Sequence, residues 1–424
     1  MLSLFSTKSI IVLFIFTFFF NSLFGQKKYS LQETLQIAKQ NSPTLRAEIF
    51  NINFAEADVL TARLKNNPQL QYQFFQISNH NFWEPGTRRG TYRNQQYWVQ
   101  LGKDIQLPHQ YRYKKEFANK SLYVSQKSFS EIQRNLFYET ANKWLDVWIA
   151  QKRLDIIQQA DKNLDTLVYV NKLRLQKQAV TQTDFLRTQL LSEQYKLQLK
   201  TARQNLSNEL RTLKQLLGTK DSITIDTTLN IPSTLPAQFP ALLEQALINR
   251  TDLLTAKGNL ELSNTNINLQ KSLALPQPNV GFAFYLEMGM PYLCFLYTTD
   301  LPFVNRNQGE IRKAQFQKTQ AERTIYAIEN RIQTEVINSY STYSLQQRNL
   351  ESFRNILQQS QRILNNVKYS YLRGGTTIID FLEAQRSWLD TRQQYFETEM
   401  EFRKAYIDLL NSTGLINQLA QEKK

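Results

Sequence analysis

Side chains able to perform bond chemistry are scarce in this sequence. Its 424 residues include two His and a single Cys, which excludes a disulfide framework and a Cys-based zinc site and argues against a His-dependent triad. It contains no nucleotide-binding loop and no metal-ligand spacing. The sequence therefore predicts a protein that is not an enzyme and that holds no cofactor or metal.

A pair of carboxylates near the C-terminus is the most informative set of charges. Asp380 and Glu383 are three residues apart in a stretch with a helical pattern, so their side chains share one face of the helix. They follow a break at Gly374 and Gly375. By themselves they are compatible with a solvated acidic surface or with favourable charge at a helix N-terminus. Their meaning depends on the elements that place them.

The composition indicates long, uninterrupted elements. Only 12 Gly and 11 Pro are available to break the chain, while 42% of the residues are hydrophobic and provide a core. The net charge of +15 permits binding to nucleic acid or to anionic lipid. The basic residues are spread along the chain rather than clustered, so we expect no nucleic-acid partner.

The N-terminus indicates export. Lys8 precedes an apolar run over 10–20, and the small residue Gly25 follows. This pattern predicts a secretory signal peptide over 1–25. The alternative is a membrane anchor, but the run is shorter than the ~20 residues that span a bilayer. No later stretch is as apolar, so any membrane-spanning part would consist of β-strands closed into a barrel.

The rest of the chain reads as two copies of one pattern. Residues 140–218 align without a gap with 336–414, at an offset of 196 and with 12 identities. The apolar phase of the helices is also preserved between these spans. We therefore predict an internal duplication. Its parts are a first repeat over 26–218, a linker over 219–240, a second repeat over 241–414 and a tail over 415–424.

Each copy has the order helix, strand pair, long helix, helix. Alternating apolar and polar residues predict β-hairpins at about 69–102 and about 278–301. Proline marks the expected ends of strands and starts of helices, at Pro68, Pro108, Pro278 and Pro302. The remaining patterns predict helices at about 31–65 with a break at Pro43, 111–177, 183–217, 241–274, 309–372 and 377–411.

The fold class is therefore mainly α with a small β part. Four strands cannot close a membrane barrel, and open strand edges are not tolerated in lipid. The chain must oligomerise to close its sheet: three copies would supply twelve strands, and four would supply sixteen. The alternation predicts that one set of strand residues faces lipid: Leu70, Tyr72, Phe74, Val280, Phe282 and Phe284.

The stretch 371–385 resembles the hallmark of the TolC-like outer-membrane efflux channels. Tyr371 and Gly374 match a Tyr-x-x-Gly turn, and Asp380 and Leu382 match the Asp-x-Leu that opens the returning helix. The duplicated layout, the proline-marked junctions and the signal peptide extend the resemblance over essentially the whole mature chain. The segment 66–70 also resembles the cation-efflux, Czc-type branch of that family.

This resemblance implies a homotrimer with a long α-helical barrel in the periplasm and a trimer-closed transmembrane β-barrel in the outer membrane. Such channels serve tripartite efflux or type I secretion as passive exit ducts. Their partners are a periplasmic adaptor (membrane fusion) protein, an inner-membrane transporter and outer-membrane lipid. The resemblance also places Asp380 and Glu383 at the periplasmic gate, as a carboxylate ring that selects cations. Crowding in that ring should raise the pKa of some of these carboxyls.

The family links its two helical hairpins near their tips by hydrogen bonds. The matching residues are the acceptor Asp184 and the donor Tyr371, with Thr183 and Thr376 beside them. Alternatively, Asp184 only caps its own helix. The sequence also departs from the family: Thr376 stands where some members carry Arg, and Gln178 lies in a stretch that copy two fills with its Gly-Gly turn.

Two other classes of protein have long helices. A periplasmic adaptor has one long helical hairpin rather than two, and it needs β-rich, Gly-rich domains that this sequence lacks. A secreted coiled-coil structural protein would not need the alternating strand pairs. Both remain alternatives to the channel.

Overall fold

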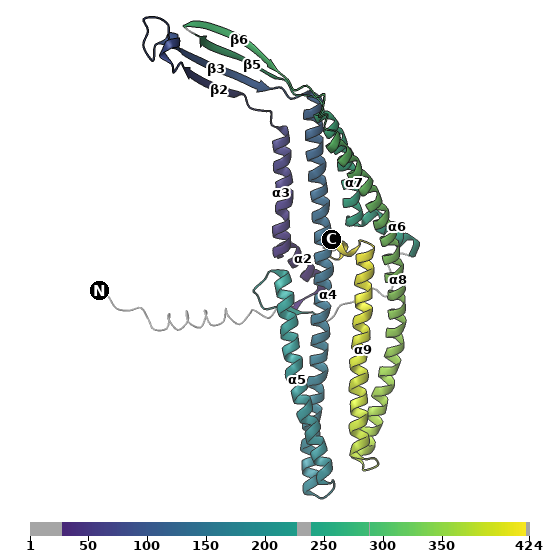
Figure 1. The fold of residues 1–424 in the computed structure, drawn as a ribbon. Helices are drawn as coiled ribbons and strands as arrows, with labels where there is room; N and C mark the ends of the chain where they lie inside the picture. Colours follow the sequence, from purple (N-terminus) through teal and green to yellow (C-terminus); the bar gives the residue numbers. More distant parts are fainter. Residues whose placement is uncertain (1–27, 227–238, 288, 421–424) are drawn as a thin grey trace, which may run out of the picture. The chain divides into compact units, whose positions relative to one another are not determined.

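The computed structural model describes residues 28–226, 239–287 and 289–420. The predicted signal peptide over 1–25 and most of the predicted linker lie outside the described residues, as do the last four residues of the tail. The chain is mainly helical with a small β part, as the sequence predicts (Figure 1).

The two copies contain matching elements. The first copy holds β1 (Lys28–Tyr29), α2 (Leu31–Asn41), α3 (Pro43–Arg63), β2 (Gln69–Gln76), η1 (His80–Phe82), η2 (Tyr92–Asn94), β3 (Gln95–Asp104), α4 (Pro108–Gln176) and α5 (Gln182–Leu217), and β4 (Thr224–Ile225) lies in the predicted linker. The second holds α6 (Phe239–Asn249), α7 (Thr251–Leu273), β5 (Asn279–Glu287), β6 (Met290–Thr298), α8 (Gln308–Leu372) and α9 (Ile378–Ser412), and α10 (Ile416–Leu419) lies in the predicted tail.

One predicted helix is in fact two. The sequence pattern predicts a continuous helix over about 241–274, but the structure divides it at Arg250 into α6 and α7. The break matches the one before Pro43 in the first copy. At each break the last residue before the next helix, Ser42 or Arg250, donates its backbone N–H to the carbonyl four residues earlier. The guanidinium of Arg250 is buried and donates to Glu335 Oε2 at 2.6 Å and to the Ser412 carbonyl at 3.2 Å. The buried ion pair of Arg250 thus stabilises the break between α6 and α7, which has no proline in the sequence to mark it.

The chain divides into two compact units, and each takes segments from both copies. In the described residues, the first unit comprises 28–47, 131–226, 239–250 and 330–420, and the second comprises 48–130 and 251–329 except residue 288. The helices α4 and α8 contribute to both units. The first unit holds the two helical hairpins and the short pair of strands β1 and β4, and the second holds β2, β3, β5 and β6.

Aromatic and apolar side chains form the centre of the first unit. Phe137, Trp144 and Trp148 of α4 are almost completely buried. Nearby, β1 pairs in parallel with β4. The helices α5 and α9 end next to the breaks between α2 and α3 and between α6 and α7. At both places a glycine with positive φ is needed: a Cβ on Gly218 would lie 2.5 Å from the Asn41 carbonyl oxygen, and one on Gly414 would lie 3.1 Å from the Asn249 carbonyl carbon.

The second unit contains a four-stranded antiparallel sheet in the order β2-β3-β5-β6. The two hairpins are joined by β3 and β5, where Gly102 lies opposite Gly281. A Cβ on Gly281 would lie 2.6 Å from the Leu101 carbonyl oxygen, so the close approach requires glycine. The strands β2 and β6 form the two edges of the sheet.

The register gives the sheet two different faces. Residues paired across strands point to the same side, so one face collects the apolar residues of all four strands: Leu70, Tyr72, Phe74, Tyr97, Val99, Leu101, Val280, Phe282, Phe284, Leu286, Leu293, Phe295 and Tyr297. Most of these side chains are exposed in the single chain. Gln71, Gln73 and Gln100 lie on the other face. The predicted alternation is therefore present and continuous across both hairpins.

Across the described residues, no helix is both long enough and apolar enough to cross a membrane.

Candidate functional site

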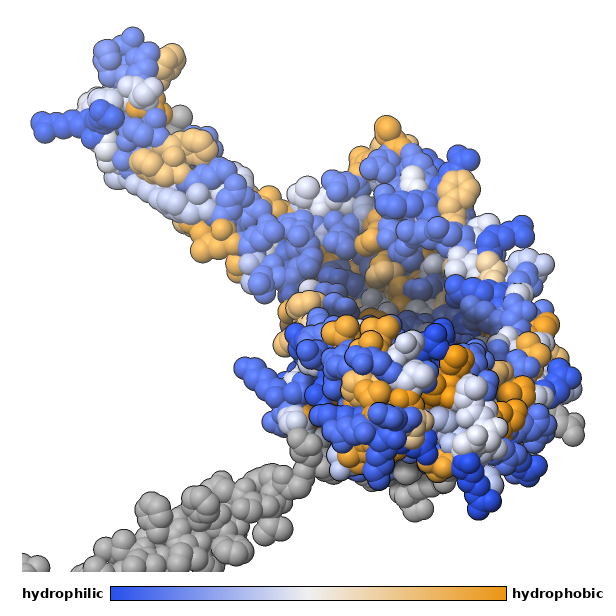
Figure 2. Space-filling model, turned by 90° about the horizontal axis from the view of Figure 1, so that it is seen from below, coloured by the Kyte–Doolittle hydropathy of each residue, from blue (hydrophilic) through white to orange (hydrophobic). Residues whose placement is uncertain are grey.

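The tips of the two helical hairpins carry most of the residues that the sequence singled out. Tip one joins α4 to α5 and tip two joins α8 to α9, both at the lower end of Figure 1. Hydrophilic side chains cover much of the near surface in the view from below, with smaller hydrophobic patches between them (Figure 2).

Both tips begin with the same backbone turn. At tip two the N–H of Gly374 donates to the Tyr371 carbonyl at 3.1 Å, and that of Gly375 donates to the Ser370 carbonyl at 2.9 Å. At tip one, Gln178 and Ala179 make the equivalent bonds at 2.9 and 2.8 Å. This pair of bonds defines a Schellman motif, which satisfies the last carbonyls of a helix.

The motif requires a left-handed residue, and the two tips supply different ones. Gly374 has φ of 78° and Gln178 has φ of 57°. Glycine adopts this conformation without steric cost, whereas a side chain with a Cβ does not. The turn that the sequence marked with Gly374 and Gly375 thus recurs at tip one without glycine.

Both returning helices open with a capping box. In tip one the Thr181 hydroxyl donates to Asp184 Oδ2 at 2.7 Å while accepting from the Asp184 N–H at 3.1 Å. In tip two, Thr377 and Asp380 make the same bonds at 2.7 and 3.2 Å. Asp184 and Asp380 therefore have equivalent roles in capping α5 and α9. The alternative given above, that Asp184 caps its own helix, describes its side chain in the structure.

Tip two holds its carboxylate with one more donor. The Thr376 hydroxyl donates to Asp380 Oδ2 at 2.7 Å, so Thr376 bonds within its own tip. Hydrogen bonds from the Thr377 hydroxyl, the Thr376 hydroxyl and the Thr377 backbone N–H, in that order of importance, lower the pKa of Asp380. Within one chain the pKa shift is thus opposite to the rise expected from crowding in a ring.

Glu383 lies one turn after Asp380, and both side chains are exposed. Tip one differs here, because the position that corresponds to Glu383 is occupied by Arg187, at the offset of 196. Tip two therefore presents two carboxylates in its first turns, whereas tip one presents a carboxylate and a guanidinium. Only tip two can form a purely acidic ring when copies are arranged around an axis.

A chain of buried hydrogen bonds connects the two hairpins. The Tyr371 hydroxyl donates to Asn171 Oδ1 at 2.8 Å, and Asn171 Nδ2 donates to Thr188 Oγ1 at 2.9 Å. The Thr188 hydroxyl in turn donates to the Asp184 backbone carbonyl at 2.9 Å. Asn171 and Thr188 are fully buried, and Tyr371 is nearly so. Each polar atom in this chain of bonds has a partner, as burial requires.

This arrangement corrects one expectation. The resemblance implied a direct bond between Tyr371 and Asp184, but the Tyr371 hydroxyl donates to Asn171, and the Asp184 carboxylate accepts from Thr181. Asp184 is reached only through its backbone carbonyl. The reason is the capping box, which turns the carboxylate toward the start of its own helix. Thr183 lies exposed in the first turn of α5.

Sequence reasoning did not identify Asn171 or Thr188. A signal was available for Asn171, which interrupts the apolar stripe formed by Leu164, Val168 and Leu175 at spacings of three and four. A polar residue in the apolar stripe of a helix needs a buried partner.

Aromatic and cationic contacts add to this connection. The ring of Tyr371 stacks on that of Phe381, with centroids 5.2 Å apart and planes 4° from parallel. The guanidinium of Arg174 lies 5.0 Å from the Tyr371 ring centroid and donates to the Leu372 carbonyl at 3.3 Å. Arg174 comes from α4, so it is a second link between the hairpins.

A groove of about 320 Å³ runs along α4, α8 and α9 above this contact. Tyr371, Phe381 and Trp388 line it together with glutamine and asparagine side chains.

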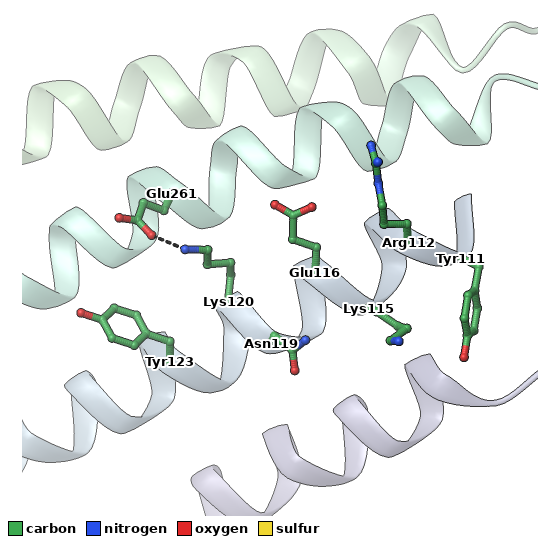
Figure 3. A pocket seen from close by; sticks show the side chains of 8 residues that line it. All are labelled: Tyr111, Arg112, Lys115, Glu116, Asn119, Lys120, Tyr123 and Glu261. Carbon is green, nitrogen blue, oxygen red and sulfur yellow. Dashed lines mark hydrogen bonds and ion pairs between the residues drawn. The ribbon is translucent and has the colours of Figure 1, made fainter. Parts of the chain in front are cut away.

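A larger pocket of about 680 Å³ lies in the second unit, on α4 and α7. Figure 3 shows its eight side chains, among which Lys120 Nζ lies 2.5 Å from Glu261 Oε2. Both partners are more than a third exposed, so this ion pair adds little to stability. None of the predicted site residues lines this pocket.

The junction prolines occupy two kinds of position. Pro68 and Pro278 directly precede β2 and β5, and Pro108 is the first residue of α4. The Pro278 carbonyl accepts from the Ile105 N–H at 2.8 Å, which ties the two hairpins at this end. Pro302 lies in the loop after β6, and α8 begins only at Gln308.

Comparisons with known proteins agree on one family. The family model described as "Outer membrane efflux protein" matches residues 34–219 and 295–415, which is most of the chain. No curated protein sequence matches the chain.

Solved structures share the fold at low sequence identity. A structure of CusC, described in connection with transmembrane channel formation, is 16% identical, with a TM-score of 0.76 over 93% of this chain and 95% of that chain. The Campylobacter jejuni CmeC outer membrane channel is 15% identical, with a TM-score of 0.73 over 91% of this chain and 85% of that chain. The Neisseria gonorrhoeae MtrE outer membrane channel is 17% identical, with a TM-score of 0.72 over 91% and 89%.

The family match covers both hairpin tips and thus the turns, caps and buried hydrogen bonds described above. It confirms the resemblance read from the segment 371–385 and decides against a periplasmic adaptor and a secreted coiled coil. The chain therefore belongs to the outer membrane efflux protein family, whose members are outer-membrane channels with a helical tunnel in the periplasm.

Proposed function

We propose that three copies of this chain form one passive exit duct, which serves a tripartite efflux system or type I secretion. A periplasmic adaptor protein and an inner-membrane transporter would deliver the cargo. The observation that carries this proposal is the pair of open sheet edges on a chain of this family: β2 and β6 each have an unpaired side in the single chain. A chain with such edges needs a neighbour before it can sit in lipid.

The two edges differ from each other, so pairing β6 of one copy with β2 of the next gives a head-to-tail ring. Exposed apolar side chains on the helices support the same arrangement. They include Phe50 and Phe54 on α3, Leu190 and Leu197 on α5, and Ile363 on α8. Burial of these side chains against neighbouring copies would remove apolar surface from water.

In this ring the apolar face of the sheet would meet lipid and the polar face would line the duct. The apolar face combines Phe282 and Phe284 with the side chains of the other strands, and many of them are exposed in the single chain. Cysteine at Tyr72 or Phe284, introduced in a Cys294→Ser background, should react with a lipid-soluble label and resist a water-soluble one. Labelling in the opposite order would contradict this orientation.

We assign the gate to tip two. Asp380 and Glu383 are exposed and close in sequence, and three copies would bring six carboxylates to within about one helical turn of each other along the duct. Such a ring concentrates cations and binds multivalent cations most strongly. The buried contacts of Tyr371 with Asn171 and Arg174 would hold the mouth closed, as a latch between the hairpins.

The oligomeric state tests the central assumption. An outer-membrane fraction in mild detergent should contain a species of three times the mass of the mature chain, which heating converts to a monomer that is lighter than the 49.8 kDa of the full sequence by its signal peptide. A monomer before heating would overturn the ring, and a species of four copies would overturn the count of three.

A further inference from the structure

Three aromatic side chains form a row on the polar face of the sheet. Trp98 of β3 stacks on Tyr285 of β5 with ring centroids 5.1 Å apart and planes 13° from parallel. Tyr285 stacks in turn on Tyr292 of β6, at 4.7 Å and 11°. The three residues are direct partners in the register. The row therefore crosses three strands at one height.

The described strand residues around the row are largely polar and include no basic side chain on this face. Gln73 lies beside Trp98, and Glu287 lies two residues beyond Tyr285 on the same face, where Gln96 Nε2 donates to Glu287 Oε1 at 3.2 Å. Among the described strand residues of this sheet the one basic side chain is Lys103, and its partner Val280 places it on the apolar face. The polar face thus carries negative charge, with no cation among its strand residues to compensate it.

The row is not required to fill a core. Tyr292 is 37% exposed, Trp98 and Tyr285 are half-buried, and none of the described helices packs extensively on the sheet. Tyr285 has a ring on each side, so the ring faces without a stacked aromatic neighbour in the row are those at the two ends, which we call the free ring faces: the face of Trp98 toward Gln73 of β2 and the face of Tyr292 toward the open edge at β6. In a head-to-tail ring, each free face would flank a β2 strand.

We propose that this row is a transit site for planar organic cations, and the proposal rests on the duct proposed above. An aromatic ring face attracts a cation through its quadrupole, and a planar ligand also stacks on it. The carboxylate of Glu287 adds attraction for positive charge, and the glutamine side chains supply hydrogen-bond donors and acceptors. A planar anion would meet the same ring faces but would be repelled by Glu287.

Block of single channels by a defined probe tests this site. We would add N-methylquinolinium to the purified full chain in a planar lipid bilayer, with tetramethylammonium as a cation without a ring and 2-naphthalenesulfonate as a planar anion. Wild type should be blocked most strongly by N-methylquinolinium. The double variant Trp98→Leu with Tyr292→Leu, which keeps apolar side chains but removes both free ring faces, should weaken that block about tenfold.

Two matched variants separate the site from general damage to the sheet. Tyr97→Leu with Tyr297→Leu removes two rings from the apolar face and should leave the block within about twofold. Glu287→Gln should weaken block by the planar cation and strengthen block by the planar anion. If the double variant does not assemble, each single Leu variant should show about a threefold loss.

The outcomes are distinct. Conducting channels whose block is the same in wild type and in the Trp98 and Tyr292 variants would overturn the transit site and leave the duct intact. Equal loss in the apolar-face control would overturn it as well. A wild-type chain that forms no conducting channel would overturn the duct itself.

Discussion

The two hairpin tips share a scaffold and differ in what they place on it. Each has a Schellman turn followed by a Thr-x-x-Asp capping box, at equivalent positions 196 residues apart. Tip one uses the scaffold to hold the buried acceptors Asn171 and Thr188. Tip two uses it to present Tyr371 to tip one and two carboxylates to solvent.

The difference shows how a duplicated element can divide two tasks. The capping boxes fix the start of each returning helix, so neither task depends on the turn sequence being identical. In the function proposed above, the substitution of a few side chains would then separate a latch surface from a gate surface. Two differences between aligned positions of the copies matter most: tip two has Glu383 where tip one has Arg187, and it has Tyr371 where tip one has Leu175. The following changes test whether this division holds.

The largest expected effect is on cation binding at tip two. Asp380→Asn with Glu383→Gln removes six carboxylates from a ring of three copies, so we expect block by a trivalent cation to weaken at least about tenfold, since each lost charge contributes on the order of 1 kcal/mol. Single-channel recording measures it. The matched change at tip one, Asp184→Asn with Arg187→Gln, should shift the block by less than about twofold. Equal effects at the two tips would remove the distinction between them.

The next effect concerns the latch. Asn171→Leu leaves the Tyr371 hydroxyl without its buried acceptor and removes the amide that donates to Thr188 Oγ1, which should destabilise the closed tips by about 1–3 kcal/mol. We expect a larger single-channel conductance than in wild type. Tyr371→Phe should act in the same direction but less strongly. If Asp184→Asn opened the channel as much as Asn171→Leu, the direct bond read from the sequence would be the correct latch after all.

A smaller effect should follow from exchanging the turn residues. Gln178→Gly removes the side chain from a residue in the left-handed conformation, so the stability of tip one should rise by about 1 kcal/mol. Gly374→Gln should lower the stability of tip two by a similar amount. Nothing lies within 4 Å of a Cβ built on Gly374, so the cost would come from the backbone alone. Amide hydrogen exchange at each tip measures these changes in local stability. A Gly374→Gln tip as protected as wild type would show that the turn is not under this constraint.

The smallest effect is the pH dependence of the tip-two cap. The pKa of Asp380 is lowered in the folded chain, so the cap contributes stability above the ordinary Asp pKa of about 3.9 and loses it as the pH falls through the lower folded value. Thr377→Val removes the donor that lowers this pKa most, so protection of the tip-two amides should then be lost at a higher pH. Loss at the same pH in both proteins would mean that the ring, rather than the cap, controls this carboxyl.

Local sequence patterns were sufficient to predict most of the helices and strands. The alternation over 69–102 and 278–301 predicted both hairpins, and the long helical stretches ended within a few residues of the predicted positions. The break at Arg250 was missed because its cause is a buried ion pair with Glu335, 85 residues away, which no local pattern reveals. The four-stranded order was equally hidden, because the pairing of β3 with β5 joins segments almost two hundred residues apart.

The site was predicted less completely than the fold. Asp380 and Glu383 could be proposed as gate residues from the sequence because they lie in a short segment that resembles the family hallmark. Asn171 could not, because its importance depends on a contact with Tyr371 that crosses from one hairpin to the other. The row of Trp98, Tyr285 and Tyr292 was not predicted, because the alternating pattern was interpreted only for the residues of the apolar face, and the row depends on strand pairing that the sequence does not show.

Sidedness of block in the wild-type channel tests the assignment of the gate most directly. Hexaamminecobalt(III), added in turn to each side of a planar bilayer that contains a single oriented channel, should block from the side of the hairpin tips, where Asp380 and Glu383 would form the ring. Addition on the side of the sheet should have a much weaker effect. Equal block from both sides, or block from the sheet side alone, would contradict a gate at tip two.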